Sequence, residues 1–98
     1  MKPVFSIIIP VYNRPEELDE LLASILAQEY DEVFEVYIIE DGSSVKSDLI
    51  VKKYSSELSI HYFQKENTGP GPSRNFGMQK ANGNYFIILE MLIDIVQK

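Results

Sequence analysis

Residues 6–13, Ser-Ile-Ile-Ile-Pro-Val-Tyr-Asn, constrain the fold more than any other part of this chain. Residues 4–9 are rich in β-branched and aromatic types with one polar interruption, a composition typical of a strand buried on both faces of a parallel sheet. Pro10 is expected to end this strand because it cannot donate to the ladder. Ligands of open α/β sheets bind beyond the carboxyl ends of the strands, so Tyr12 and Asn13 fall where a ligand is expected.

The rest of the chain alternates between helical and strand patterns. Leucine and isoleucine recur at helical spacing over residues 18–26, and Asn13 is expected to cap this helix, with Pro15 and Glu16 in its first turn. The other expected elements are strands over residues 34–39, 60–63 and 84–89, a helix capped by Ser47, a loop over residues 67–72 and a helix over residues 73–81. This order predicts right-handed crossovers and a mainly parallel sheet.

Length and composition limit the classes of protein to consider. The 98 residues, 45% of them hydrophobic, predict a single domain over residues 1–98, small for a complete α/β enzyme. A net charge of −6 disfavours nucleic acid and membrane surfaces as partners. The absence of cysteine fits a cytoplasmic location. The apolar run over residues 85–96 is broken by two acids and is too short to be a transmembrane segment.

Three residues form a candidate ligand site. If the first two strands are neighbours, Tyr12 and Asp41 lie side by side and offer a ring face and a carboxylate, which suits a nucleobase with a donor edge, such as the N3–H of uracil. Arg74 could orient Asp41 or reach a base carbonyl. Each residue also has a plain explanation, as a surface tyrosine, a common Asp-Gly turn and a weak ion pair. His61, alone in a strand, is given no role.

The phosphate groups of a nucleotide find no ready site in this sequence. No G-x-G-x-x-G follows the first strand, and no P-loop motif occurs anywhere. Glu16 and Glu17 stand in the first turn of the first helix and would repel a diphosphate there. A bound nucleotide would therefore need a metal or basic groups elsewhere for its phosphates.

Three motifs in chain order, SIIIPVYN, EDGSS and NTGPGPSRN, resemble those of family 2 inverting glycosyltransferases. The resemblance covers residues 4 to about 90 and implies the first, nucleotide-binding half of the glycosyltransferase A fold. It thus implies an incomplete α/β, Rossmann-like three-layer sandwich with a four-stranded sheet in the order 3-2-1-4. It also implies inverting sugar transfer from a nucleotide-diphosphate sugar of the UDP or dTDP type.

By motif, the same resemblance assigns roles to single residues. It implies that Pro10, Val11 and Tyr12 line the base pocket, that Asp41 accepts a hydrogen bond from the base and that Arg74 supports Asp41. Of these residues, Tyr12 and Asp41 are also at positions where the strand pattern predicts a ligand.

The family's metal motif, Asp-x-Asp at the end of the fourth strand, binds Mg²⁺ or Mn²⁺ and is altered here. Glu90 stands at the first acidic position, and Leu92, which cannot bind a metal, at the second. In an extended chain Asp94 would lie about 13 Å from Glu90, too far to share an ion.

Two consequences are expected. The chain ends before the half that supplies the acceptor site and the general base in this family, so we expect a truncated domain that transfers no sugar alone. Apolar residues around Phe86, Ile88 and Met91 would then be uncovered, so self-association through the sheet edge is expected. The alternatives are a noncatalytic nucleotide-binding or interaction module and, more distantly, a phosphoacceptor domain that uses Asp41.

Overall fold

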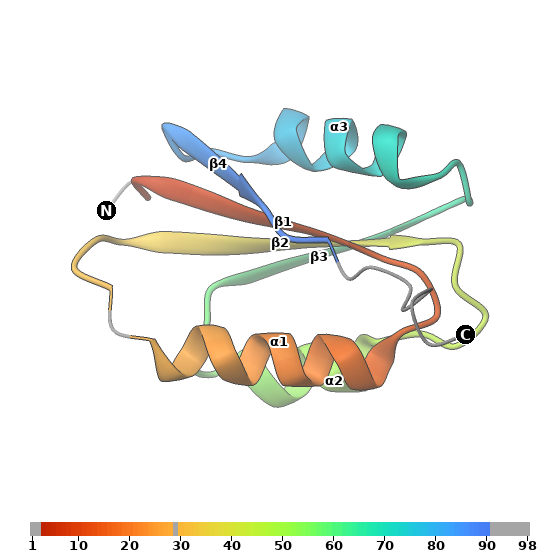
Figure 1. Ribbon diagram of the computed structural model, residues 1–98, viewed down its shortest axis with the longest axis horizontal. Helices are drawn as coiled ribbons and strands as arrows, with labels where there is room; N and C mark the ends of the chain where they lie inside the picture. Colours follow the sequence, from red (N-terminus) through yellow and green to blue (C-terminus); the bar gives the residue numbers. More distant parts are fainter. Residues whose placement is uncertain (1–2, 29, 91–98) are drawn as a thin grey trace, which may run out of the picture.

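The computed structural model describes residues 3–28 and 30–90, which form an α/β sandwich of three layers (Figure 1). Helices α1 and α2 cover one face of a central sheet, and α3 covers the other. The elements in chain order are β1 (Phe5–Val11), α1 (Pro15–Ala27), β2 (Phe34–Asp41), α2 (Asp48–Tyr54), β3 (Ile60–Lys65), α3 (Pro70–Lys80) and β4 (Tyr85–Ile88).

The sheet contains four parallel strands in the order β3-β2-β1-β4. The predicted fold class and strand order are therefore confirmed. All four strands run the same way, so the ends of β1, β2 and β3 meet at one edge, on the right in Figure 1. We call this the carboxyl edge, and it is the edge at which a ligand is expected.

Successive side chains along β1 and β2 point to opposite faces of the sheet, so each face has its own hydrophobic core. The side chains of Ile7 and Ile9 pack with those of α1 and α2, whereas Ile8 packs with Tyr37 and Ile39 on the face that α3 covers. Gly77 lets α3 approach closely, because a Cβ there would lie 2.6 Å from a methyl carbon of Ile8. Burial on both faces explains why these strands read as continuous apolar runs.

The prediction that Pro10 ends the first strand is wrong. Pro10 lies inside β1, where it is paired in register with Ile39, and the strand continues to Val11. The amide of Leu89 donates to the carbonyl of Ile8, so Ile8 directs its backbone groups toward β4. Pro10 is two residues further on and faces the same side, past the last residue of β4, so its missing N–H costs no ladder bond.

Two helix starts also differ from the prediction. The N-cap of α1 is Arg14, without a side-chain capping bond, and Asn13 takes a left-handed conformation with φ of 54°. Asn13 instead uses its side chain in a neighbouring turn, which removes the expected capping box with Glu16. Helix α3 begins at Pro70 rather than at Ser73, since proline at the first helical positions loses no hydrogen bond.

A buried carboxylate at the opposite, amino edge ties the last crossover to the sheet. Glu35, which begins β2 together with Phe34, accepts hydrogen bonds from the Ser6 hydroxyl and the Asn82 amide, both at 3.0 Å, and lies 3.1 Å from His61 Nε2. The amide of Gly83 donates to the same Ser6 hydroxyl. His61 therefore has a structural partner, in agreement with its having been given no role.

Glu35 should contribute to stability in a pH-dependent way. Burial opposes ionisation of its carboxyl, but hydrogen bonds from Asn82, Tyr37 and Ser6, with the charge of His61, hold the pKa of Glu35 below its ordinary value. This contribution is present above the unfolded-state pKa of about 4.3 and is lost as the pH falls through the lower folded-state pKa.

We predict that Glu35→Gln lowers the free energy of unfolding by about 1–3 kcal/mol near neutral pH, because a buried acceptor is lost and a donor is left unpaired. Urea denaturation at several pH values measures the change, and the variant should lose stability less steeply in acid. Glu57→Gln at an exposed position serves as the control and should match the parent. Equal stability of Glu35→Gln and the parent would refute the role of Glu35.

Candidate functional site

Asp41 is the most heavily engaged side chain at the carboxyl edge. Its Oδ1 accepts from Lys65 Nζ at 2.8 Å and from the Thr68 amide at 2.9 Å, and its Oδ2 accepts from the Gly69 amide at 3.0 Å. The Asn67 side chain donates to the Asp41 carbonyl at 3.0 Å and lies 3.5 Å from Oδ2. A carboxylate has about four acceptor positions, so the long Asn67 contact on Oδ2 is the one that a further donor could replace.

These contacts keep Asp41 ionised. Burial of its carboxyl raises the pKa, but the hydrogen bonds from Lys65, Thr68 and Gly69 and the charge of Lys65 outweigh burial and hold the pKa of Asp41 below its ordinary value. A carboxylate in this state accepts hydrogen bonds and donates none.

The turn after β2 and the loop after β3 touch at Gly42. This residue has φ of 71°, and a Cβ on it would lie 2.6 Å from the backbone nitrogen of Asn67. Both the positive φ and the close approach require glycine. The contact brings the Asp41 carboxylate and residues 67–69 together.

A second buried carboxylate, Glu40, joins three segments on the opposite face of the sheet. Its Oε1 accepts from the Ser47 amide at 2.8 Å and from the Tyr62 hydroxyl at 2.6 Å, and its Oε2 accepts from the Ser43 hydroxyl. The Ser43 hydroxyl in turn accepts from the Asn13 amide at 2.8 Å. Glu40 thereby links the turn after β2 to Tyr62 in β3 and, through Ser43, to the backbone that follows β1.

Asn13 completes the link between the first two loops. Its side-chain carbonyl accepts from the Val45 amide at 2.9 Å and from the Ser44 hydroxyl at 3.3 Å. Asparagine tolerates the left-handed conformation that this position requires. The residue before it, Tyr12, is thus held at the carboxyl edge with 52% of its surface exposed.

The structure brings the predicted base-binding residues to one edge. Val11 pairs in register with Glu40, so Tyr12 and Asp41 are the next residues along two neighbouring strands. Pro10 lies on the same face of the sheet as Asp41, by the alternation that places Ile8 with Ile39, whereas Val11 is buried in the core on the other face. The contact of these residues with a base stays a prediction.

Arg74 does not contact Asp41, contrary to one expectation from the sequence. Its guanidinium pairs with the carboxylate of Glu90, beyond the end of β4. Lys65 takes the place beside Asp41 instead, because the two are register partners at the ends of β3 and β2. The sequence analysis missed Lys65 because it ended the third strand at residue 63. Extending that strand by two residues would have placed Lys65 at its carboxyl end, beside Asp41.

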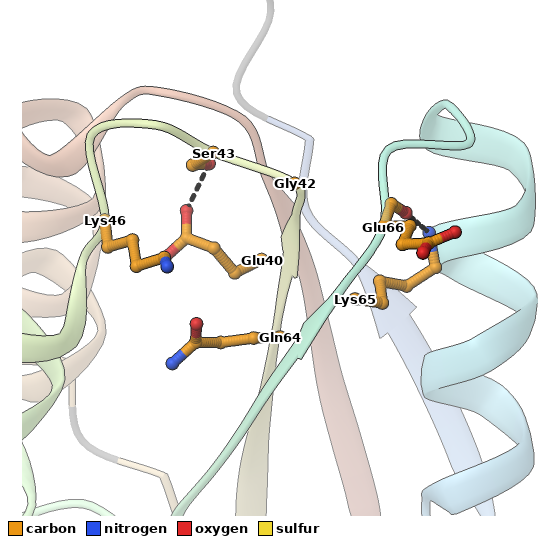
Figure 2. A pocket seen from close by; sticks show the side chains of 7 residues that line it. All are labelled: Glu40, Gly42, Ser43, Lys46, Gln64, Lys65 and Glu66. Atoms are coloured by element: carbon orange, nitrogen blue, oxygen red, sulfur yellow. Dashed lines mark hydrogen bonds between the residues drawn. The ribbon is translucent and has the colours of Figure 1, made fainter.

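A hollow of about 380 Å³ lies next to this site, between the turn after β2 and the end of β3. Figure 2 shows Glu40 and Gln64 directed to one side of the sheet and Lys65 to the other, toward α3. The hollow is lined by Glu40, Gly42, Ser43, Lys46, Gln64, Lys65 and Glu66. Asp41 is not among them, so the hollow lies beside the predicted base site.

The described residues alone form no site for the divalent metal that the resemblance implies. Over residues 3–28 and 30–90, no three histidine or acidic side chains come together as a metal site. Glu90, the one acid of the motif within that range, is already paired with Arg74. Leu92 and Asp94 lie outside the described residues.

Comparison with protein families supports the sequence motifs. The model of the family described as "Glycosyl transferase family 2" matches residues 6–90. An uncharacterized glycosyltransferase of Rickettsia bellii is 39% identical over 85 residues, which make up 87% of this chain and 12% of that protein. The poly(ribitol-phosphate) beta-N-acetylglucosaminyltransferase TarS of Staphylococcus aureus is 34% identical over 89 residues, or 88% of this chain and 16% of TarS.

Solved structures show the same fold. S. aureus TarS 1-349 in complex with UDP superposes with a TM-score of 0.82 at 34% identity, over 92% of this chain and 27% of that one. A mannosyltransferase of Pyrobaculum calidifontis superposes with a TM-score of 0.81 at 22% identity, which supports the fold alone. The chain therefore spans less than a third of either structure.

Proposed function

We propose that this chain, which belongs to glycosyl transferase family 2, binds the nucleotide of a nucleotide-diphosphate sugar donor for inverting sugar transfer. The observation that carries the proposal is the carboxylate of Asp41, held ionised at the carboxyl edge, with its Oδ2 bound closely by the Gly69 amide and only at 3.5 Å by the Asn67 side chain. TarS structures hold UDP and UDP-GlcNAc. We therefore favour a uridine or thymidine diphosphate sugar.

In the proposed complex each residue has one task. Asp41 accepts from the N3–H of the base, and the exposed ring of Tyr12 stacks on the base face. Pro10 lies beneath the base on the face that it shares with Asp41, and Val11, buried on the other face, supports the end of β1 behind it. Arg74, which pairs with Glu90 further along the same edge, supplies a cation for the donor diphosphate.

A panel of nucleotides tests this proposal by thermal unfolding. UDP at about 100 times its Kd should stabilise the chain by about 2.7 kcal/mol, a rise in Tm of about 10–20 °C for a domain of this size. Asp41→Ala should abolish the shift, and Glu57→Ala, a change of charge at an exposed distant position, should retain it. Added Mn²⁺ should leave the shift unchanged, since Glu90 is paired with Arg74.

Equal shifts for purine and pyrimidine nucleotides, or no shift for any of them, would contradict the proposal. A shift that requires Mn²⁺ would contradict only our reading of Glu90.

We also propose that residues 1–98 form one domain that transfers no sugar by itself. The acids at the proposed donor side already have partners, since Asp41 and Glu40 each accept at least three hydrogen bonds and Glu90 is paired with Arg74. To test for transfer activity, the chain is incubated with UDP-sugars and the release of UDP is measured. Sustained release that Asp41→Ala abolishes would show the prediction to be wrong.

None of the helices that the structure describes is long and apolar enough to cross a membrane. We propose a cytoplasmic location from the absence of cysteine, and cell fractionation tests it.

An interaction role is a second candidate, because of β4. Its four residues, Tyr85–Ile88, are 37–67% exposed, and in the described residues this strand pairs on one side with β1. An exposed apolar strand edge is a template for further pairing. We propose that β4 pairs with β4 of a second copy of the isolated chain.

Light scattering over a range of concentrations checks the pairing. The parent should form dimers or larger species, and Ile87→Lys should be monomeric because the charge cannot be buried at the edge. Leu49→Lys, which changes an equally apolar residue that is 75% exposed on α2, should associate like the parent. A monomeric parent at high concentration would contradict the proposal, and a longer chain that is monomeric would point to following residues as the cover of β4.

A further inference from the structure

Lys65 is held more tightly than a surface lysine. Its Nζ contacts Asp41 Oδ1 at 2.8 Å, the Glu66 carbonyl at 2.9 Å and the Thr68 hydroxyl, with the Ser73 hydroxyl at 3.4 Å. An ammonium has three donors, so these acceptors saturate it. The Lys65 and Asp41 side chains are 15% and 5% exposed, whereas those of the pair Lys53–Asp19 are 57% and 31% exposed.

Lys65 supplies the charge at Asp41. The other groups that face this carboxylate are neutral: the amides of Thr68 and Gly69, the Asn67 side chain and the hydroxyl of Ser73 near Lys65. From α3, Arg74 is turned to Glu90, and from β1 the nearest positions on this face are apolar.

The ionisation of Asp41 decides which base edge it can meet. An ionised carboxylate can accept from the N3–H of uracil or thymine, but it faces the lone pair of N3 in cytosine. A neutral carboxyl group can donate to N3 of cytosine and accept from its amino group. Protonation of Asp41 would therefore change the base preference of the site from uracil to cytosine.

We propose that Lys65 is a positioning residue that determines base selectivity, by fixing Asp41 as an acceptor and so admitting uracil or thymine and rejecting cytosine. This inference rests on the proposed nucleotide-binding function and deepens it. The lowered pKa of Asp41, which burial opposes and hydrogen bonding with the Lys65 charge produces, supports the same conclusion.

The experiment compares Kd for UDP and CDP between about pH 7.5 and pH 5.5, a range above the ordinary Asp pKa, so that only a carboxyl whose pKa has been raised takes up a proton while N3 of cytosine stays unprotonated. The parent should prefer UDP throughout. Lys65→Met keeps the length of the side chain and removes its charge, and its preference for UDP should fall by about tenfold or more toward acid, where each tenfold is about 1.4 kcal/mol. Lys65→Arg, which restores the charge, should recover the preference.

Lys52→Met is the matched control, because it removes an exposed lysine on α2 away from the carboxyl edge. It should behave as the parent at every pH. Lys65→Gln, which keeps a polar side chain of similar reach, is the second variant if Lys65→Met unfolds.

A measurement without nucleotide tests the role of Lys65 separately from the proposed nucleotide binding. Carbon-detected NMR titration of the Asp41 carboxyl should show a higher pKa in Lys65→Met than in the parent, Lys65→Arg and Lys52→Met. If the parent binds UDP but Lys65→Met keeps its pH-independent preference, or if the Asp41 pKa is unchanged in Lys65→Met, the role of Lys65 is refuted. If the parent binds neither nucleotide, the proposed function itself fails.

Discussion

The buried contact between the Asp41 carboxylate and the loop after β3 is the constraint on which the carboxyl edge depends. Four donors from Lys65 and residues 67–69 converge on this residue, and Gly42 allows the loop to approach. The contact sets the start of α3, because Gly69 is both a donor to Asp41 and the N-cap of that helix. One side chain thus places a loop, a helix and a candidate ligand site.

Strand β2 carries three buried acids, and each organises a connection. Glu35 at its amino end holds the segment between α3 and β4, Glu40 joins the loops on the α1 and α2 face, and Asp41 holds the loop on the α3 face. Burial of a carboxylate is costly unless hydrogen bonds compensate, and here backbone amides supply them. The acids at the two ends of this otherwise apolar strand therefore determine the positions of the connections that pack against it.

Sequence reasoning reached the fold because apolar periodicity and turn residues agree along the chain. The runs at residues 34–39 and 84–89 predicted strands, and the parallel order 3-2-1-4 followed from the family resemblance. The sequence reasoning also placed Tyr12 and Asp41 at one edge, because the positions of the strand ends are enough to predict this. It was wrong about Pro10, because a proline is tolerated inside β1 only where β4 has already ended, and the sequence did not show that end point.

Partners across the sheet were harder to predict. Asn13 has the residue type of a helix cap, but Ser44 and Val45 compete for its side chain through a contact that only the tertiary fold creates. Lys65 reaches Asp41 because the two are register partners at the ends of β3 and β2, and Arg74 on α3 pairs with Glu90 instead. The predicted end of the third strand fell two residues short of Lys65, so its pairing with Asp41 was missed.

A crystal structure of the chain with UDP would test the central claim most directly. We expect uracil N3 within hydrogen-bond distance of Asp41 Oδ2, about 2.7–3.2 Å, with the Tyr12 ring against the base. A base bound away from this edge, or an Asp41 carboxylate with no contact to it, would contradict the account.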